Sequence, residues 1–195
     1  MLGPTLVAIS VTLLACGGTD GGAGTETTAV AGIDREATAV EMVDQFDQAL
    51  RALNARYQFT TTLEVEGAAV SQIVGRNIDG NTTTAATVAA NTIDVTGVGV
   101  EFWIRTGASA WVPAANAPAS QDPLAALLAV TEVTFFDGSL SITYPGAALG
   151  FEIGWVTAQV NIVGPSVEVV AVLEGLTGRS TLSPAIDLSA ITAPY

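Results

Sequence analysis

The chain has 195 residues, of which 49 % are hydrophobic, and these supply enough apolar side chains for one sizeable core and a single domain. Nineteen acidic residues outweigh six scattered arginines to give a formal charge of −13, so a phosphate-binding surface for nucleic acid is not expected. The absence of histidine and lysine excludes Ser-His-Asp, Cys-His and Schiff-base catalysis and the P-loop lysine.

The N-terminal segment carries the only cysteine. Residues 2–15 are apolar but too few to cross a bilayer, which needs about 20 apolar residues. Leu13-Leu14-Ala15-Cys16, followed by two glycines, resembles a bacterial lipobox, which predicts a signal peptide over residues 1–15 and acylation of Cys16. The alternative is that Cys16 is a small buried hydrophobe in a core helix. Two acyl chains would hold the protein at the extracytoplasmic face of the cell membrane.

Two helices are predicted in the remainder. Residues 16–32 are predicted to be the acylated cysteine and a flexible Gly- and Thr-rich tether, and residues 33–195, which contain both helices, are predicted to form the domain. The first helix runs from Ile33 to Tyr57 with Asp34 as its cap. Its apolar stripe has steps of three and four and consists of Val40, Val43, Phe46, Leu50, Leu53 and Tyr57. A second, short helix follows the cap Asp122, starts with Pro123 and reaches about Val130.

In the rest of the domain apolar and polar residues alternate with a period of two, which indicates strands. The first strand has Phe59, Thr61, Leu63 and Val65 on one face and ends at Gly67. Further strands are expected over 71–79, 82–90, 92–105 with an irregularity at Gly97 or Gly99, 110–113, 131–136, 140–144, 150–163, 166–173 and 179–182. Turns are expected at 79–81, 137–138, 145–146, 164–165 and 175–178. Short connections favour antiparallel hairpins, so the fold class is α+β, with a strongly curved antiparallel sheet packed on one long and one short helix.

The carboxylates do not form an obvious site. Six of them occupy single alternating positions of strand-like runs, as expected for a solvated face: Glu64, Glu66, Glu101, Glu152, Glu168 and Glu174. A carboxylate-based hydrolase would instead need two acids about 5 to 9.5 Å apart in a cleft. We therefore expect no enzyme activity, no metal site and no cofactor.

Several segments resemble the actinobacterial LppX/LprG lipoproteins and, more distantly, the lipoprotein carrier LolA. They are the Leu-Leu-Ala-Cys anchor, the helix from Glu41 to Leu53 that leads into Tyr57-Gln58-Phe59-Thr60, the run from Val100 to Trp111, the Asp122-Pro123 helix with Leu127-Leu128, and the ending Ile191-Thr192-Ala193-Pro194. The resemblance covers about residues 33–195. It implies a half-barrel sheet with helices across its mouth, and a cavity that holds a lipid or acyl group.

The inward faces of helix and strands are the expected wall of such a cavity. They present Phe46, Leu50, Leu53, Phe59, Leu63, Val65, Val100, Phe102, Ile104, Leu140, Ile142, Phe151, Ile153 and Trp155. The same side chains would equally fill an ordinary core without a cavity. Trp103 and Trp111 fall on other registers, where they either pack or lie at a rim.

The leading functional hypothesis is binding and transfer of a lipid or lipoglycan acyl chain by an anchored envelope lipoprotein. Its expected partners are that ligand, the membrane through Cys16 and an envelope transporter, without nucleic acid. The alternative is a structural or protein-interaction module with a solid core and an apolar surface patch.

Overall fold

The structure, a computed structural model, describes residues 28–53, 55–115, 122–136, 139–149, 154–173 and 175–194, with side chains of the first helix from residue 38 onward. The predicted signal peptide, Cys16 and the turn at 137–138 lie outside these residues. The described part consists of two α-helices, one 3₁₀ turn and eleven strands.

Helix α1 (Thr28–Leu53) begins and ends earlier than predicted. Residues 28–32 of the predicted tether are helical, and Asp34 lies inside the helix, so its assignment as the cap is wrong. Tyr57, the predicted last residue of the helix, belongs instead to strand β1 (Arg56–Val65), where it pairs with Asn77 and Pro184. The run of aromatic and β-branched residues that begins at Tyr57 favours the strand, because alternate side chains of this run can then be buried.

The first half of the chain continues as a meander of hairpins: β2 (Ala68–Ile78), β3 (Asn81–Val88), β4 (Asn91–Val98), β5 (Glu101–Thr106) and β6 (Val112–Ala114). The predicted strand over 92–105 is therefore two strands, because Gly99 adopts a positive φ of 61° in the turn between them. The predicted turn at Asp79-Gly80 is confirmed, since both residues have positive φ.

Helix α2 (Pro123–Leu128) separates the two halves of the sheet and starts as predicted, with Asp122 at the cap and Pro123 in the first turn. The second half comprises β7 (Glu132–Phe136), β8 (Ser139–Pro145), the 3₁₀ turn η1 (Gly146–Leu149), β9 (Trp155–Val163), β10 (Ser166–Leu173) and β11 (Leu176–Pro184). Residues 176–178 lie in β11, so the turn predicted there is confined to its first residue, Gly175.

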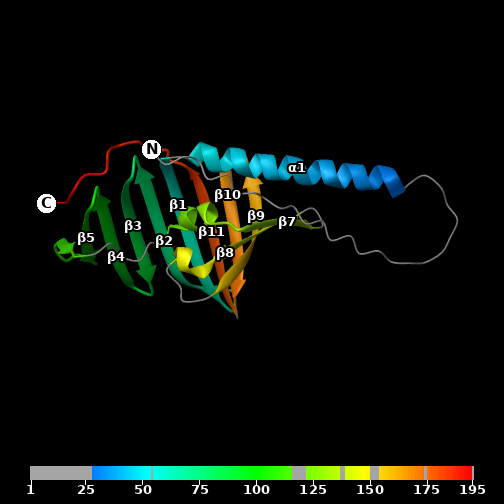
Figure 1. Ribbon diagram of the computed structural model, residues 1–195. Coiled ribbons are helices and arrows are strands. Elements are labelled where there is room, and N and C mark those ends of the chain that lie inside the picture. Colours follow the sequence, from blue (N-terminus) through cyan, green and yellow to red (C-terminus); the bar gives the residue numbers. More distant parts are fainter. Residues whose placement is uncertain are drawn as a thin grey trace.

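All eleven strands form one antiparallel sheet in the order β6-β5-β4-β3-β2-β1-β11-β10-β9-β8-β7. The two halves of the chain join where β1 pairs with β11, from Tyr57–Pro184 to Val65–Leu176. The sheet is curved and not closed, since β6 and β7 are its two edges (Figure 1). The expectation of a curved antiparallel sheet with helices is confirmed.

The two faces of the sheet differ in character. The helix face, defined by Phe59, Ile73, Val167 and Leu182, packs against α1 and α2 and forms the hydrophobic core. Helix α1 contacts β9, β10 and β11, and α2 contacts β8 and β11 (Figure 1). The opposite, outer face carries polar residues that alternate with these, among them Gln58 and Arg76.

Candidate functional site

The predicted inward residues divide into three groups. Five of them are buried in the core beneath the helices: Phe46, Leu53, Phe59, Leu140 and Ile142. Four are half-buried: Leu50, Leu63, Phe102 and Ile104. Phe151 and Ile153 lie outside the described residues. These nine residues are buried or half-buried, as expected for an inner wall, but they do not line a single cavity, since only Leu63 lines the cavity described below.

Three further predicted wall residues are exposed. Val100 is 92 % exposed because it lies in the turn between β4 and β5. Trp155 is 63 % exposed and opens β9 on the outer face, because the neighbouring Val156 takes the buried position. Val65 is 43 % exposed at the end of β1. The prediction that these three side chains form an enclosed inner wall is wrong.

A small apolar cavity of about 110 Å³ lies on the helix face, and it is lined by α2 rather than α1. Its walls come from six neighbouring strands and are built mainly by Leu63, Ile73, Val156, Val169, Leu173 and Leu176, with Tyr144 of β8. Antiparallel pairing brings these residues together, since β1 pairs with β2 and β11, and β10 pairs with β11 and β9. Ligand pockets have volumes of at least about 300 Å³, so this cavity is smaller than a typical ligand pocket.

The floor of the cavity is formed by small residues, two of which are hydrogen-bonded to each other. Thr61 and Ser180 are direct partners across β1 and β11, and their hydroxyl oxygens lie 2.9 Å apart in a hydrogen bond. Ala171 and Gly178 are paired beside them and leave the space that larger side chains would fill. Because these two hydroxyls are hydrogen-bonded to each other and most other lining residues are apolar, the cavity offers mainly apolar surface.

Pro123 of helix α2 lines the cavity, and a partly buried hydrogen bond connects the start of this helix to the sheet. The Tyr57 hydroxyl donates to one carboxylate oxygen of Asp122, and the Leu124 main-chain N–H donates to the other at 2.9 Å. Tyr57 is 4 % exposed, and its partner immediately precedes the first residue of α2. The pair therefore fixes the start of α2 against β1.

Burial sets the ionisation of this pair. Burial raises the pKa of Asp122, while the hydrogen bonds from Tyr57 and Leu124 act in the opposite direction. Burial, and then the hydrogen bond to Asp122, raises the pKa of Tyr57. Burial also raises the pKa of Tyr144, which lines the cavity. The Tyr57 phenol is thus held neutral as a hydrogen-bond donor to Asp122.

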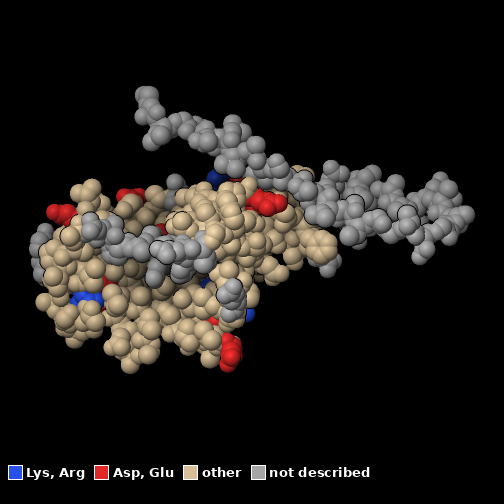
Figure 2. Space-filling view, turned by 60° about the horizontal axis from the view of Figure 1, so that its bottom comes forward, with Lys and Arg blue, Asp and Glu red and all other residues tan. Residues whose placement is uncertain are grey.

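The acidic residues do not assemble into a chemical site in the part of the chain that the structure describes. No group of three His, Cys, Asp or Glu residues with metal-binding geometry occurs there. Glu64 and Glu168 lie on the outer face and contact Arg179 and Asn161, respectively. Glu152 and Glu174 lie outside the described residues. Figure 2 shows acidic and basic side chains in separate small patches on the face in view.

Of the twelve cavity residues, only Leu63 was predicted as a wall residue. The missed residues are Thr61, Ile73, Pro123, Tyr144, Val156, Val169, Ala171, Leu173, Leu176, Gly178 and Ser180. The alternation of Val167, Val169 and Ala171 within β10 marks their shared face. The small residues at positions 171 and 178 could not be recognised as lining one cavity without knowing that the strand register pairs them.

Comparisons with known proteins give little further information. No protein-family model matches the chain, and no curated protein matches it. A solved structure of a DUF1329 family protein from Desulfovibrio piger is similar over 80 % of this chain and 95 % of that chain, at 9 % identity and a TM-score of 0.37. Among the described residues, no helix combines the length and hydropathy needed to span a membrane.

Proposed function

We propose that this protein is an envelope lipoprotein of the LolA-like half-barrel type, similar to LppX/LprG, that binds and transfers a hydrophobic ligand. The ligand would be an acyl chain of a lipid or lipoglycan, seated between α2 and the helix face. The observation that carries this proposal is the apolar cavity under α2, with small residues at Ala171 and Gly178 and the Thr61 and Ser180 hydroxyls hydrogen-bonded to each other at its floor.

The size of the cavity sets a condition on the proposal. A volume of about 110 Å³ receives the end of an acyl chain, and a whole chain requires α2 to move away from the sheet. Helix α2 has only six residues and contacts β8, β11 and η1. We therefore treat α2 as a movable cover that the Tyr57–Asp122 hydrogen bond holds in the closed position.

The membrane anchor belongs to the same proposal. Acylation of Cys16 would keep the domain at the extracytoplasmic face of the cell membrane, where acyl ligands are exchanged and an envelope transporter would be the partner. The net charge of −13 argues against a domain that lies flat on anionic lipid headgroups. A domain held off the bilayer by its anchor suits transfer between membrane and partner.

One observation favours the alternative, a structural or protein-interaction module. Between the C-terminal end of α1 and the centre of the sheet the core is tightly packed, with Leu53, Leu140, Val167 and Leu182 completely buried. A filled core with no ligand predicts that the cavity under α2 is a packing defect of fixed size. The two candidates therefore differ in whether an apolar probe enters beside Ala171.

The test is a fluorescence titration with dansyl-labelled undecanoic acid. Ala171→Leu places three extra carbon atoms in the cavity, whereas Val172→Leu enlarges the next side chain, which is 64 % exposed on the outer face. We expect saturable binding by the wild type and by Val172→Leu, and at least tenfold weaker binding by Ala171→Leu. Because the cavity has room, Ala171→Leu should leave stability unchanged or raise it by up to about 2 kcal/mol. Absence of binding by the wild type, or equal binding by both variants, contradicts the proposal.

A further inference from the structure

The two edge strands of the sheet differ in how well they are protected against a further strand. Strand β6 has only three residues and contains Pro113, which has no N–H to donate to a neighbour. Strand β7 has five residues, Glu-Val-Thr-Phe-Phe, with neither proline nor lysine, and β-branched and aromatic residues of this kind favour strand pairing. Within the described part of the chain β7 pairs with β8 alone, so one edge of its main chain can accept a partner (Figure 1).

An apolar groove lies beside this open edge. It has a volume of about 180 Å³ and is enclosed by α1, α2 and the first two residues of β7. Its apolar walls are formed by Phe46, Leu50, Leu127, Leu128, Val130 and Val133. Leu128 is 71 % exposed, so the groove is accessible from solvent. We call this space the β7 groove, and its volume suits a single apolar side chain better than a whole small-molecule ligand, which needs at least about 300 Å³.

Acidic residues border the β7 groove. Asp47 lines it from α1 and is bound to Arg51 at 2.9 Å, whereas Glu132 lines it from β7 and is exposed. Glu132 forms no ion pair with any residue that the structure describes. The chain as a whole has a formal charge of −13, so a basic segment is attracted to this edge and a second copy of the chain is repelled.

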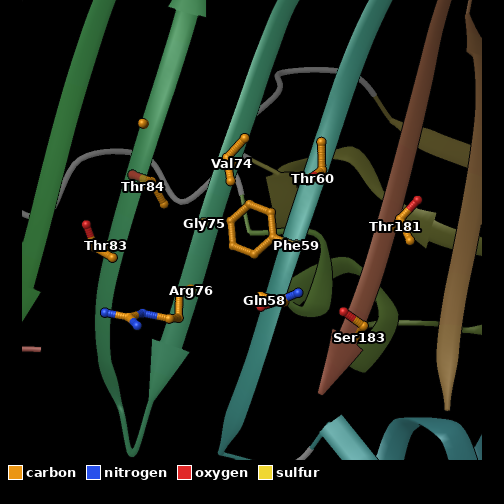
Figure 3. Close-up of a pocket in the computed structure, with 11 residues that line it drawn as sticks. Gln58, Phe59, Thr60, Val74, Gly75, Arg76, Thr83, Thr84, Thr181 and Ser183 are labelled. Atoms are coloured by element: carbon orange, nitrogen blue, oxygen red, sulfur yellow. The ribbon is translucent and has the colours of Figure 1, made fainter. Parts of the chain in front are cut away.

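A larger hollow, of about 530 Å³, lies over β11, β1, β2 and β3 (Figure 3). The C-terminal segment of the chain already bonds to its polar groups, since Arg76 pairs with Asp187 and Gln58 accepts a hydrogen bond from the Ile186 N–H at 3.4 Å. These four strands are each paired on both sides. The hollow therefore offers no free strand edge, in contrast to the β7 groove.

We propose that β7 binds an extended, basic segment of a partner protein as an additional strand of the sheet. Free main-chain groups along a strand edge are complementary to another extended main chain, which supplies affinity, while a neighbouring pocket supplies specificity. Alternate side chains of the added strand point to opposite faces, as Glu132 and the buried Val133 do in β7. One face places an apolar side chain in the β7 groove, and the other places a basic side chain beside Glu132.

This inference goes beyond acyl-chain binding and does not depend on it. The residues that line the β7 groove and those that line the cavity under α2 do not overlap. Ala171→Leu, which fills the cavity, should therefore leave binding at β7 within about twofold of the wild type.

The test is fluorescence anisotropy of the full chain with four fluorescein-labelled heptapeptides, Lys-Val-Thr-Xaa-Lys-Val-Thr, in which the central residue is valine, leucine, phenylalanine or tryptophan. One control peptide replaces both lysines by glutamate. Two others carry main-chain N-methyl groups at the apolar or at the polar residues, which removes the donors of one strand edge or the other, because the N–H groups of alternate residues point to the same edge.

Two pairs of protein variants locate the binding site. Leu128→Ala removes an exposed wall of the β7 groove, and its control is Val112→Ala, a site 60 % exposed on the opposite edge strand. Glu132→Lys reverses the charge at the groove, and Glu101→Lys makes the same change in net charge at an exposed position of β5. All four side chains are exposed, so the variants should keep the fold.

We expect saturable binding of at least one lysine peptide. Leu128→Ala and Glu132→Lys should each weaken it about fivefold or more, while both controls stay within about twofold of the wild type. At least one N-methylated peptide should bind about tenfold more weakly than its parent.

Four results would overturn the inference. They are binding of none of the lysine peptides, equal binding of the glutamate peptide, undiminished binding of both N-methylated peptides, and equal effects of the variants and their controls. Sedimentation velocity provides a further check, because a dimer of this chain that Leu128→Ala dissociates would assign the edge to a second copy instead of a basic partner.

Discussion

The contact between Phe59 and Gly75 gives the sharpest test of packing on the helix face. The two residues are direct partners on β1 and β2, and a Cβ at Gly75 would lie 2.2 Å from Cζ and 2.4 Å from Cε1 of the ring. Phe59 is only 4 % exposed, so the ring has no solvent side into which it can move. Overpacking costs about 1 to 3 kcal/mol, and replacing a strand glycine returns about 0.5 to 1 kcal/mol. Gly75→Ala should therefore lower the free energy of unfolding by about 1 to 2 kcal/mol.

A double-mutant cycle shows whether this loss comes from the ring. Phe59→Leu alone should cost about 1 to 2 kcal/mol, but it also removes the ring atoms that clash with the methyl group introduced by Gly75→Ala. The double variant should then be about 1 to 2 kcal/mol more stable than the sum of the single effects, measured by urea unfolding followed by circular dichroism. Gly178→Ala is the control, because its Cβ would meet only ordinary contacts, the nearest at 3.6 Å. Additive effects within about 0.5 kcal/mol would refute the reasoning.

Three further predictions follow from other contacts. Tyr57→Phe removes the Tyr57 hydrogen bond to the partly buried Asp122 carboxylate, which keeps the Leu124 N–H as a donor, and should cost about 1 to 3 kcal/mol in urea unfolding. Asp122→Asn keeps the cap and should cost less than about 1 kcal/mol, so similar losses would argue against this contact. The Ser189 hydroxyl and N–H, with Arg76, lower the pKa of Asp187 from 3.8 to about 2, so the contact is fully present above pH 3.8 and is lost as the pH falls to about 2. The amide protection factors of residues 185–194 should fall over that interval, and Asp187→Asn should abolish this pH dependence. Constant protection factors would contradict the prediction. Leu53→Ala should cost about 2 to 5 kcal/mol, because Leu53 is fully buried, while Val40→Ala, at a site 55 % exposed, should stay within about 0.5 kcal/mol.

Local patterns in the sequence predicted much of the sheet. The alternation that starts at Phe59 places Thr61 and Leu63 on its face, and the structure puts all three on the helix face. Asp122 followed by proline marked the start of α2 because a capping side chain and a fixed φ act within one turn. Signals of this kind are complete within a few residues, so they can be read without tertiary information.

The errors arose where tertiary contacts decide between local alternatives. Tyr57 fits both the apolar stripe of a helix and a position near the start of a strand, and its pairing with β2 and β11 selects the strand. Trp155 was assigned inward because the start of its strand was placed earlier, and a shift of one residue reverses the face. The exposed position of Val100 followed from a missed turn at Gly99.

The candidate sites were less accessible from sequence than the fold. The cavity depends on Ala171 and Gly178 being opposite each other on β10 and β11. Asp187 of the C-terminal segment pairs with Arg76, which lies 111 positions earlier in the sequence, and no local pattern predicts this ion pair. The cavity and this ion pair both depend on how distant segments align, and hydrophobic periodicity alone does not determine that alignment.

The measurement that tests the central claim most directly is native mass spectrometry of the chain purified from lipid-containing membranes, before and after organic extraction. The proposed acyl-chain function predicts a mass excess beyond any covalent modification, which extraction removes and which Ala171→Leu reduces. A spectrum with only the mass of the covalent chain, identical before and after extraction, would contradict the account.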